Sequence, residues 1–249
     1  MLQKRIIPCL DVKDWKVVKW VKFKNHKIIW DVLDLAKKYA ESWADELVFY
    51  DISASTKWKT VDKKWIEDIA TVINIPFCVA GWIRTISDAK KILSLWADKI
   101  SINSPALDNP DFINELVEIV WSQAVVIWMD SYFDWEDYYV YKYTWSEKTI
   151  QNTQLKTADW IKEVVQRWAW EIVLNCINQD GVRKGYDIEQ LKIMWKISTI
   201  PLVASGWAGE EKDFLEVFKK TRVTWALAAS VFHYDIIDIW ELKEYVRIK

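Results

Sequence analysis

The sequence predicts a (β/α)8 barrel made of two similar halves. Short runs rich in valine and isoleucine alternate with longer amphipathic runs along all 249 residues, and eight such alternations are typical of this fold. No linker or low-complexity segment interrupts them, and two stretches half a chain apart resemble each other. A doubly wound parallel sheet is the alternative, but a repeat at half the chain length favours two four-strand halves that close on each other.

Eight strands, separated mostly by helices, account for the alternation. Helical spacing is clear at Val32, Leu35, Ala36 and Tyr39, where apolar residues recur every three or four positions. We expect a single domain over residues 1–249, with half-barrels of about 1–120 and 121–249. The predicted strands lie near residues 5–11, 46–51, 76–80, 98–103, 124–130, 171–177, 200–204 and 225–230.

The repeat centres on two Gly-Trp pairs. Residues 79–84 read VAGWIR and residues 204–209 read ASGWAG, so that Gly81 and Gly206 lie 125 positions apart. Each pair follows a short apolar run and precedes a helix-like segment. A strand that ends in glycine and leads into a helix is a common way for α/β proteins to hold a phosphate. Two copies therefore predict a ligand with two phosphates.

Charge and hydropathy narrow the class of partner. The formal net charge of −2 and the pI of about 5.8 give no electrostatic case for binding nucleic acid. The apolar run after Lys4 and Arg5 stops at Asp11, which is too short for a signal peptide. No apolar stretch of about 18 residues predicts a membrane span.

Cysteine and histidine usage predicts a cytoplasmic protein without a metal. Cys9, Cys78 and Cys176 all fall inside predicted strands, as buried reduced thiols do. His26 and His233 are far apart, and neither lies in a cluster of cysteines or carboxylates. We therefore expect neither a metal site nor a cofactor.

Tryptophan is abnormally frequent in this chain and glycine abnormally rare. There are 19 tryptophans and 5 glycines, whereas glycine averages about 7% of residues. Many of the tryptophans stand where a positive φ, and so glycine, is expected. A bulky residue at positive φ costs about 1–2 kcal/mol, so the chain as written should fold poorly. Trp43, Trp96, Trp121 and Trp168 follow predicted helices, and Trp15 and Trp135 occupy tight turns.

This mismatch leads to the hypothesis that most of the tryptophans are glycines in the natural protein. The UGA codon is read as glycine in some bacterial lineages and as tryptophan under other codes. Replacing all 19 would give 24 glycines, a normal content for a loop-rich barrel. Trp65 and Trp160 lie on apolar helical faces and are expected to be genuine. The alternative is an aromatic-rich protein with unusual loops.

With glycine in place of tryptophan, residues 5–15 become RIIPCLDVKDG. This segment resembles the start of the cyclase subunit of imidazole glycerol phosphate synthase, a family of histidine biosynthesis. The resemblance covers nearly the whole chain, and its motifs together are highly specific. They are DELVF at 45–49, DKISIN at 98–103, SQAVV at 122–126, QDG at 179–181, GYD at 185–187, AASVFH at 228–233 and ELKEY at 241–245.

The resemblance implies a barrel enzyme and its reaction. The family's substrate is a ribulosyl-formimino aminoimidazole carboxamide ribonucleotide that carries a phosphate at each end. Ammonia attacks it, and the products are imidazole glycerol phosphate and an aminoimidazole carboxamide ribonucleotide. The ammonia comes from a glutamine amidotransferase subunit in a heterodimer. This chain has no glutaminase nucleophile constellation, so glutamine hydrolysis is expected in another chain.

Asp11 and Asp130 match the family's two catalytic carboxylates. Each ends a predicted strand, the first and the fifth, at the barrel face where such enzymes place their chemistry. Closing an imidazole adds ammonia, loses water and breaks a C–N bond, and each step moves a proton. We expect Asp11 to be the principal general acid/base and Asp130 its partner across the substrate. Taken alone, either aspartate could merely cap a βα loop.

The resemblance also assigns phosphate contacts to both halves. Backbone N–H groups do most of this work, so small residues are needed for close approach, and literal tryptophans at 82 and 207 would obstruct both sites. Ordinary turn glycines, and a helix N-cap at Ser230, are the alternative interpretations. The assigned residues are Gly81, Trp82, Asn103 and Ser104 in one half, and Asp180, Gly181, Gly206, Trp207, Ala229 and Ser230 in the other.

Charged residues at strand starts match the family's ammonia gate. They begin predicted strands 1, 2, 4 and 6, so they can converge at one end of the barrel, although a purely structural salt-bridge ring would look the same. Lys19 lies in the first βα loop, which in the family closes over substrate, and a solvated lysine is equally open there. Cys9 and His233 are expected to be a core and a loop residue. The gate residues are Arg5, Glu46, Lys99 and Glu171.

Two other functions remain open. The sister barrel of the same pathway is an isomerase that acts on a similar two-phosphate substrate and also uses two strand-end aspartates. The CLDVK run at 9–13 and the gate residues favour the cyclase. A non-catalytic barrel that only binds a glutaminase would not need both Asp11 and Asp130.

Overall fold

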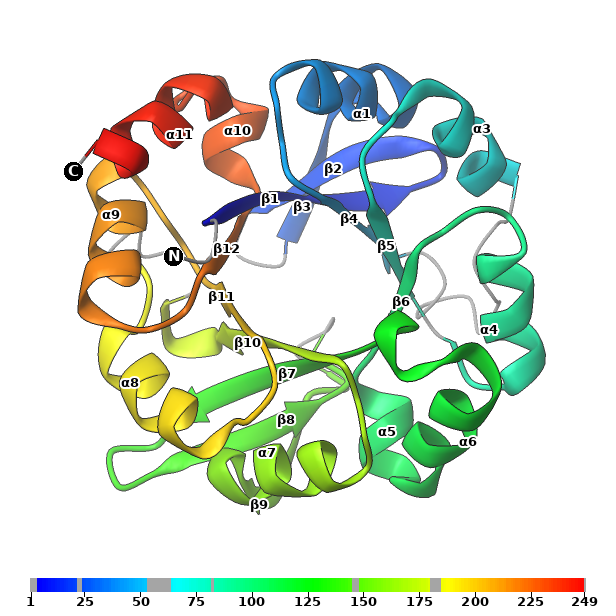
Figure 1. Cartoon of the computed structure of the whole chain (residues 1–249), viewed down its shortest axis with the longest axis vertical. Coiled ribbons are helices and arrows are strands. Elements are labelled where there is room, and N and C mark those ends of the chain that lie inside the picture. Colours follow the sequence, from blue (N-terminus) through cyan, green and yellow to red (C-terminus); the bar gives the residue numbers. More distant parts are fainter. Residues whose placement is uncertain are drawn as a thin grey trace.

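A computed structural model describes residues 4–21, 24–52, 64–81, 83–144, 148–179 and 185–248 of the chain. Eight parallel strands close into a ring in the order β1-β4-β5-β6-β7-β10-β11-β12, and β12 pairs back to β1. This is the predicted (β/α)8, or TIM, barrel (Figure 1). All eight predicted strands are confirmed. They are β1 (Arg5–Lys13), β4 (Leu47–Asp51), β5 (Phe77–Ala80), β6 (Lys99–Ile102), β7 (Val125–Phe133), β10 (Glu171–Cys176), β11 (Leu202–Ser205) and β12 (Trp225–Ala228).

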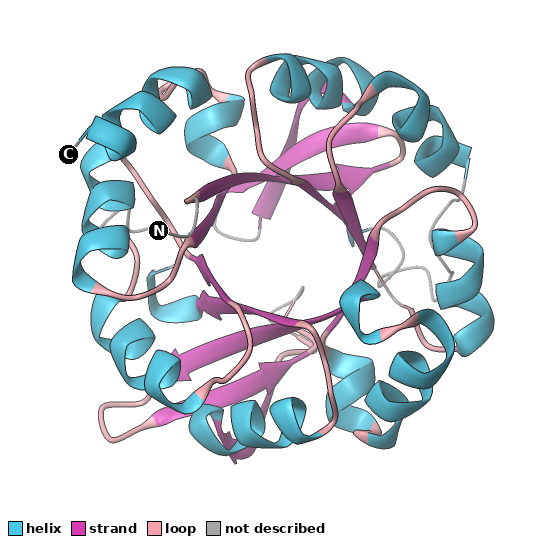
Figure 2. Ribbon diagram, viewed as in Figure 1, coloured by secondary structure: helices cyan, strands magenta, loops and turns pink. Residues whose placement is uncertain are grey.

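Helices surround the strands on the outside of the ring (Figure 2). Most carry one apolar face that packs against the barrel, as α1 does with Val32, Leu35, Ala36 and Tyr39. The described helices are α1 (Val32–Glu41), α3 (Lys64–Val72), α4 (Ile86–Leu93), α5 (Ser104–Asp108), α6 (Asp111–Val120), α7 (Thr157–Gln166), α8 (Ile188–Ile197), α9 (Glu211–Lys220), α10 (Ser230–His233) and α11 (Ile239–Ile248), with 3-10 turns η1 (Ser122–Ala124) and η2 (Ile177–Gln179). Among the described residues, no helix is long and apolar enough to cross a membrane.

The alternation of side chains along each strand divides the core into two parts. Residues such as Ile6, Leu10 and Phe49 point outward and pack beneath the helices. Their neighbours Ile7 and Cys9 point inward and belong to a separate cluster that fills the barrel interior. The strands are therefore apolar on both faces, which is why they appear in the sequence as short continuous apolar runs.

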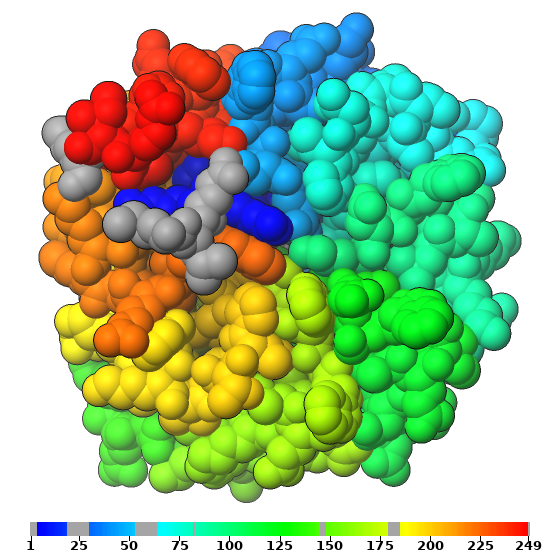
Figure 3. Space-filling model, in the orientation of Figure 1, coloured from blue at the N-terminus to red at the C-terminus, as the bar shows by residue number. Residues whose placement is uncertain are grey.

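The ring closes where the two ends of the described chain meet. Arg5 N–H donates to the carbonyl of Thr224 at 2.8 Å, and the Lys4 ammonium donates to the carbonyl of Val246 at 3.0 Å. In the space-filling view the blue segment of β1 lies near the centre of the visible end, next to the red C-terminal helices (Figure 3). The last helix thus covers the seam between the first and last strands.

Two β-hairpins extend from the barrel, and the sequence did not predict them. After β1 the chain forms β2 (Lys16–Val21) and β3 (Lys24–Asp31), and after β7 it forms β8 (Tyr138–Lys142) and β9 (Gln151–Lys156). Asp14 and Trp15, both at positive φ, make the two-residue turn that joins β1 to β2. These strands lie outside the closed ring, where the alternation of apolar runs gave no signal.

The two halves match in backbone geometry as well as in sequence. Gly81 follows β5 with φ 133°, and Gly206 follows β11 with φ 138°. Asn103 precedes α5 with φ −126° and ψ −88°, and Ala229 precedes α10 with φ −122° and ψ −74°. Since β5 and β6 stand opposite β11 and β12 in the ring, the repeat is a two-fold pseudosymmetry of the barrel.

The predicted positive-φ tryptophans are confirmed at every position named. Their φ values run from 66° to 80°, in a region that favours glycine. Trp121 is strongly strained, because with φ 69° and ψ 142° it lies in a backbone region that is almost reserved for glycine. The tryptophans are Trp15, Trp43, Trp96, Trp121, Trp135 and Trp168.

Replacing Trp121 with glycine should stabilise the barrel. Relief of the strain is worth about 1–2 kcal/mol, and the greater freedom of glycine in the unfolded chain takes back part of it, which leaves a gain of roughly 1 kcal/mol. Trp160→Gly is the matched control: Trp160 is buried in α7, and its loss should cost roughly 3–5 kcal/mol. Urea unfolding measures both variants, and a Trp121→Gly protein less stable than the parent would contradict the account.

Candidate active site

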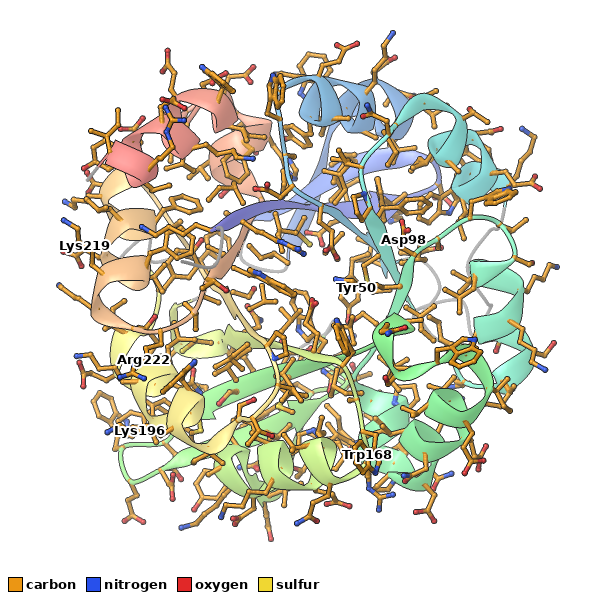
Figure 4. All side chains as sticks on the ribbon, viewed as in Figure 1. Tyr50, Asp98, Trp168, Lys196, Lys219 and Arg222 are labelled. Carbon is orange, nitrogen blue, oxygen red and sulfur yellow. The ribbon has the colours of Figure 1, made fainter. Side chains whose placement is uncertain are left out.

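The interior face of the barrel carries polar groups at both ends of the strands. A strand repeats its side-chain direction every second residue, so Arg5 and Asp11 lie on the same face of β1, about 20 Å apart. Lys99 and Asn103 share one face in the same way, and so do Glu171 and Asn175. The apolar interior cluster lies between the two polar layers. Figure 4 shows Tyr50 of this cluster inside the ring, whereas Lys196, Lys219 and Arg222 lie at its periphery.

The Asp130 carboxylate belongs to the polar layer at the strand ends, where hydrogen bonds hold it in place. It lies near the end of the buried part of β7 and accepts four side-chain hydrogen bonds. Asn103 Nδ2 and Thr144 Oγ1 donate to one oxygen, at 2.9 and 2.6 Å. Trp128 Nε1 and Asn175 Nδ2 donate to the other, at 2.9 and 2.8 Å. The carboxylate is therefore fixed in orientation from four directions.

Burial governs the electrostatics of this carboxylate. Removal from water raises the pKa of Asp130, and the donors from Thr144, Asn175, Trp128 and Asn103 offset part of the rise. Nearby, burial and the charge of Asp130 raise the pKa of the Tyr50 hydroxyl. A carboxyl whose pKa is raised exchanges its proton closer to neutral pH, as a general acid or base must.

Asp11 stands on the opposite side of the ring. It lies on β1, four strands from β7 in either direction, and is register-paired with Tyr50 of β4. Asp11 is more exposed than Asp130. The two aspartates therefore face the same space from opposite walls, one half-open to solvent and one buried.

The matched loops lie between these aspartates around the ring. Gly81 and Gly206 end β5 and β11, and Ser104 and Ser230 begin α5 and α10. Ser104 Oγ accepts the backbone N–H of Tyr143 at 2.9 Å. A Cβ added at Gly206 would meet no atom within 4 Å, so its φ of 138°, not crowding, is what favours glycine there.

Some predicted site residues fall elsewhere or outside the described residues. Lys19 lies in β2, where its backbone is paired with Lys27 of β3, so the first βα connection is a hairpin. His233 lies buried in α10, not in a loop as expected, and its Nδ1 is 2.6 Å from the Tyr39 hydroxyl. Cys9 is a core residue, as expected. Trp82, Asp180 and Gly181 lie outside the described residues.

At the strand starts, three of the predicted gate residues form one buried ion cluster. Lys99 Nζ lies 2.8 Å from Glu46 Oε2 and 2.9 Å from Glu171 Oε2. The Lys99 ammonium and the Arg5 guanidinium also lie over the Trp225 ring, 5.2 and 4.6 Å from its centroid. All four predicted gate residues therefore meet at one end of the barrel.

Burial shifts the pKa values of this cluster. It raises the pKa of Glu171 to about 7 and that of Glu46 above its usual value, although the Lys99 charge opposes both shifts. Burial alone would lower the pKa of the Lys99 amine, but the two carboxylates outweigh it and raise that pKa. With one cation between two carboxylates, the trio can take up a proton near neutral pH.

Three polar residues of the site were missed by sequence reasoning. Thr144 and Asn175 both donate to Asp130, and Ser205 Oγ donates to Asn175 Oδ1 at 3.1 Å. Ser205 ends β11 and Asn175 is the last residue but one of β10, which was an available signal. Thr144 lies in the connection between β8 and β9, a hairpin that the sequence did not reveal. Within the described part of the chain, no group of three or more His, Cys, Asp or Glu residues could hold a metal ion.

Comparison with known proteins agrees with this geometry. The family model described as "Histidine biosynthesis protein" matches residues 5–238. The chain belongs to this family. Its relatives include the "Imidazole glycerol phosphate synthase subunit HisF" of Aliivibrio salmonicida, 58% identical over 99% of this chain and 96% of the relative, and that of Pasteurella multocida, 57% identical over 99% and 97%. The Psychromonas ingrahamii protein of the same name is 58% identical over 99% and 97%.

Removing the cation from the ion cluster should destabilise the protein strongly. Lys99→Met removes the one cation in salt-bridge contact with both buried carboxylates and leaves only the Arg5 charge nearby; breaking a buried pair in this way typically costs about 3–5 kcal/mol. Lys142→Met is the matched control, because its pair with Asp108 lies near the surface and is worth less than about 1 kcal/mol. Urea unfolding compares the two, and equal losses would contradict the strength assigned to the cluster.

The stability lost in Lys99→Met should also depend on pH. The folded-state pKa of Glu171, about 7, lies above its usual 4.5, so the folded protein binds the extra proton between these values. Its contribution to stability is therefore present below pH 4.5 and is lost as the pH rises through 7. The Lys99→Met penalty should be smaller toward pH 4.5 than above pH 7, because protonated carboxyls need no cation. A penalty independent of pH would be inconsistent with this assignment.

Proposed function

We propose that this chain is the cyclase subunit of imidazole glycerol phosphate synthase. It would use ammonia to convert the two-phosphate formimino ribonucleotide into imidazole glycerol phosphate and the aminoimidazole carboxamide ribonucleotide, a step of histidine biosynthesis. One observation carries the proposal: two aspartates face each other across the barrel mouth, flanked by two matched loops. A substrate with a phosphate at each end fits such a duplicated site.

In this proposal, Asp11 and Asp130 divide the proton transfers. Asp11, the more accessible group, serves as the principal general acid/base during ammonia addition, water loss and C–N cleavage. Asp130 faces it from β7, where its four donors fix its direction. Its raised pKa supports proton exchange near neutral pH. Because the walls are rigid strands, the reacting carbons would be held between two fixed groups.

The phosphates would bind at the two matched loops. Gly81 with Asn103 and Ser104 forms one grip, and Gly206 with Ala229 and Ser230 forms the other. Backbone N–H groups after a strand-end glycine suit an anion because they point outward and carry no competing charge. Trp82 and Trp207 belong to these loops by sequence. Asp180 and Gly181 follow β10, and Lys19 follows β1, and we assign these three to substrate binding as well.

Ammonia would enter at the opposite end, from a glutamine amidotransferase partner. The relatives are named as subunits, and the Lys99 cluster closes the barrel at the strand starts. The interior beyond it is lined by apolar side chains such as Ile7, Val48 and Val126, which suit neutral ammonia better than ammonium. A hollow lies beside this end, lined by residues that include Ile75, Pro76 and Asp98, and it offers a partner subunit a surface for docking.

We also propose that the enzyme works in the cytoplasm on small molecules and not on nucleic acid. The three cysteines are buried free thiols, as a reducing compartment allows. The net charge of −2 provides no basic surface for a polynucleotide.

Asp11→Asn tests the catalytic assignment. The amide keeps the shape of the side chain but cannot transfer a proton at the working pH, so turnover with ammonia should fall by at least about a hundredfold while the substrate still binds. Asp14→Asn, in the exposed turn three residues on, is the matched control and should retain parental turnover. Substrate binding by calorimetry and imidazole formation by the purified barrel are the measurements. Near-normal turnover by Asp11→Asn would refute the role.

The same assay separates the competing functions. Ammonia-dependent turnover by the purified barrel without a partner excludes a barrel that only binds a glutaminase. If the barrel isomerises the sister enzyme's substrate and forms no imidazole, the chain is the isomerase and not the cyclase.

Glu46→Gln tests the gate. The amide removes one buried charge beside Lys99 but keeps an oxygen that can accept its hydrogen bond. With the partner present, glutamine-dependent turnover should fall several-fold, while turnover with free ammonia at the open mouth should stay near the parental rate. Equal changes in both rates would show that the cluster serves stability alone.

A further inference from the structure

We propose that the protein made in its own cells carries glycine at the six strained tryptophan positions, because those codons are UGA and are read there as glycine. The structure also identifies tryptophans that are genuine. The glycine class is Trp15, Trp43, Trp96, Trp121, Trp135 and Trp168, and the tryptophan class is Trp65, Trp160 and Trp195.

The first argument is the backbone. Ten non-glycine residues among those described have a positive φ, and six of them are tryptophan. Tryptophan makes up 19 of 249 residues, so placement independent of backbone would put fewer than one there. The exceptions include Asp14 and Asp235, a residue type that tolerates this region, whereas tryptophan gains nothing from it. An excess of this size needs a cause that determines which amino acid is written at these positions, since the folded structure gives no reason for tryptophan there.

The second argument is that five of the six side chains are largely exposed, so packing offsets little of their strain, whereas Trp15 is partly buried against the core. Trp96 and Trp121 are each 78% exposed and Trp135 is 88% exposed. Large aromatic rings normally gain their stabilisation from burial. Trp43 and Trp168 are also exposed. A strained backbone that supports a solvated indole would be a cost without a matching gain.

The third argument is that the written glycines occupy the same kind of position. Gly81, Gly185 and Gly206 all have positive φ. Gly185 additionally lacks room, since an added Cβ would lie 3.0 Å from Asp213 Oδ1. The chain thus uses two written residues for one backbone requirement, as expected when two glycine codons are translated under a code that recognises only one of them.

The tryptophan class behaves in the opposite way. Trp65 and Trp160 lie inside α3 and α7, are almost fully buried, and rank among the largest buried side chains. The Trp65 ring packs 5.5 Å from that of Phe49. Trp195 lies inside α8, with the Arg222 guanidinium 4.8 Å above its ring. Glycine inside a helix would weaken it and leave a cavity at the two buried sites.

The experiment is an intact mass and a peptide map of the protein purified from its own cells. The intact mass should fall below the 29.6 kDa of the written chain. Peptides spanning the six positions of the glycine class should contain glycine, and those with Trp65, Trp160 and Trp195 should contain tryptophan. The gene should carry UGA at the first set and UGG at the second. Tryptophan at the six positions, or glycine at Trp65 or Trp160, overturns the proposal.

A recombinant comparison provides a second test that does not depend on the source cells. One gene encodes the chain as written, a second carries all six Trp→Gly changes of the glycine class, and a third carries Trp65→Gly and Trp160→Gly. The six-fold variant should unfold at a higher urea concentration than the parent, and the two-fold variant at a lower one or not fold. A six-fold variant that unfolds earlier than the parent overturns the proposal.

Discussion

The pairing of β12 with β1 is the constraint on which the rest of the structure depends. It turns eight parallel strands into a closed ladder, so that every second side chain must point into one shared interior. That single geometric fact brings Arg5, Glu46, Lys99 and Glu171 together at one end, although they span most of the sequence. It also fixes Asp11 and Asp130 on opposing walls at the other end.

The two ends obey different electrostatics although they share the same strands. At the strand starts, charges of opposite sign are buried together, so each carboxylate has a cation to face. At the strand ends, Asp130 is held by four neutral donors, and no cation pairs with it among the described residues. The first arrangement favours a fixed, closed cluster, because opening it would expose unpaired buried charge. The second arrangement allows the Asp130 carboxyl to gain or lose a proton while the side chains around it stay in place.

The barrel and most of its polar residues could be predicted because their signals are local and periodic. Strands buried on both faces form apolar runs, and a strand end is marked by the first polar residue after such a run, as at Asp11 and Asn103. The hairpins β2–β3 and β8–β9 were missed because they lie outside the ring, and so Thr144 could not be placed. Asn175 was missed although the predicted barrel already puts the sixth strand beside the fifth, and so Asn175 beside Asp130. Positive φ was predictable at Trp121 because the turn after a helix commonly adopts it, whatever residue is written there.

The two-fold pseudosymmetry has a consequence for the direction in which a ligand binds. Two equal grips cannot distinguish one end of a molecule from the other, so direction must come from what the halves do not share. Asn103 stands where the other half has Ala229, and its side chain donates to Asp130, a contact that the apolar side chain of Ala229 cannot make. Asp130 is buried and its counterpart Asp11 is not. A duplicated scaffold thus becomes a directional one through a few unmatched side chains.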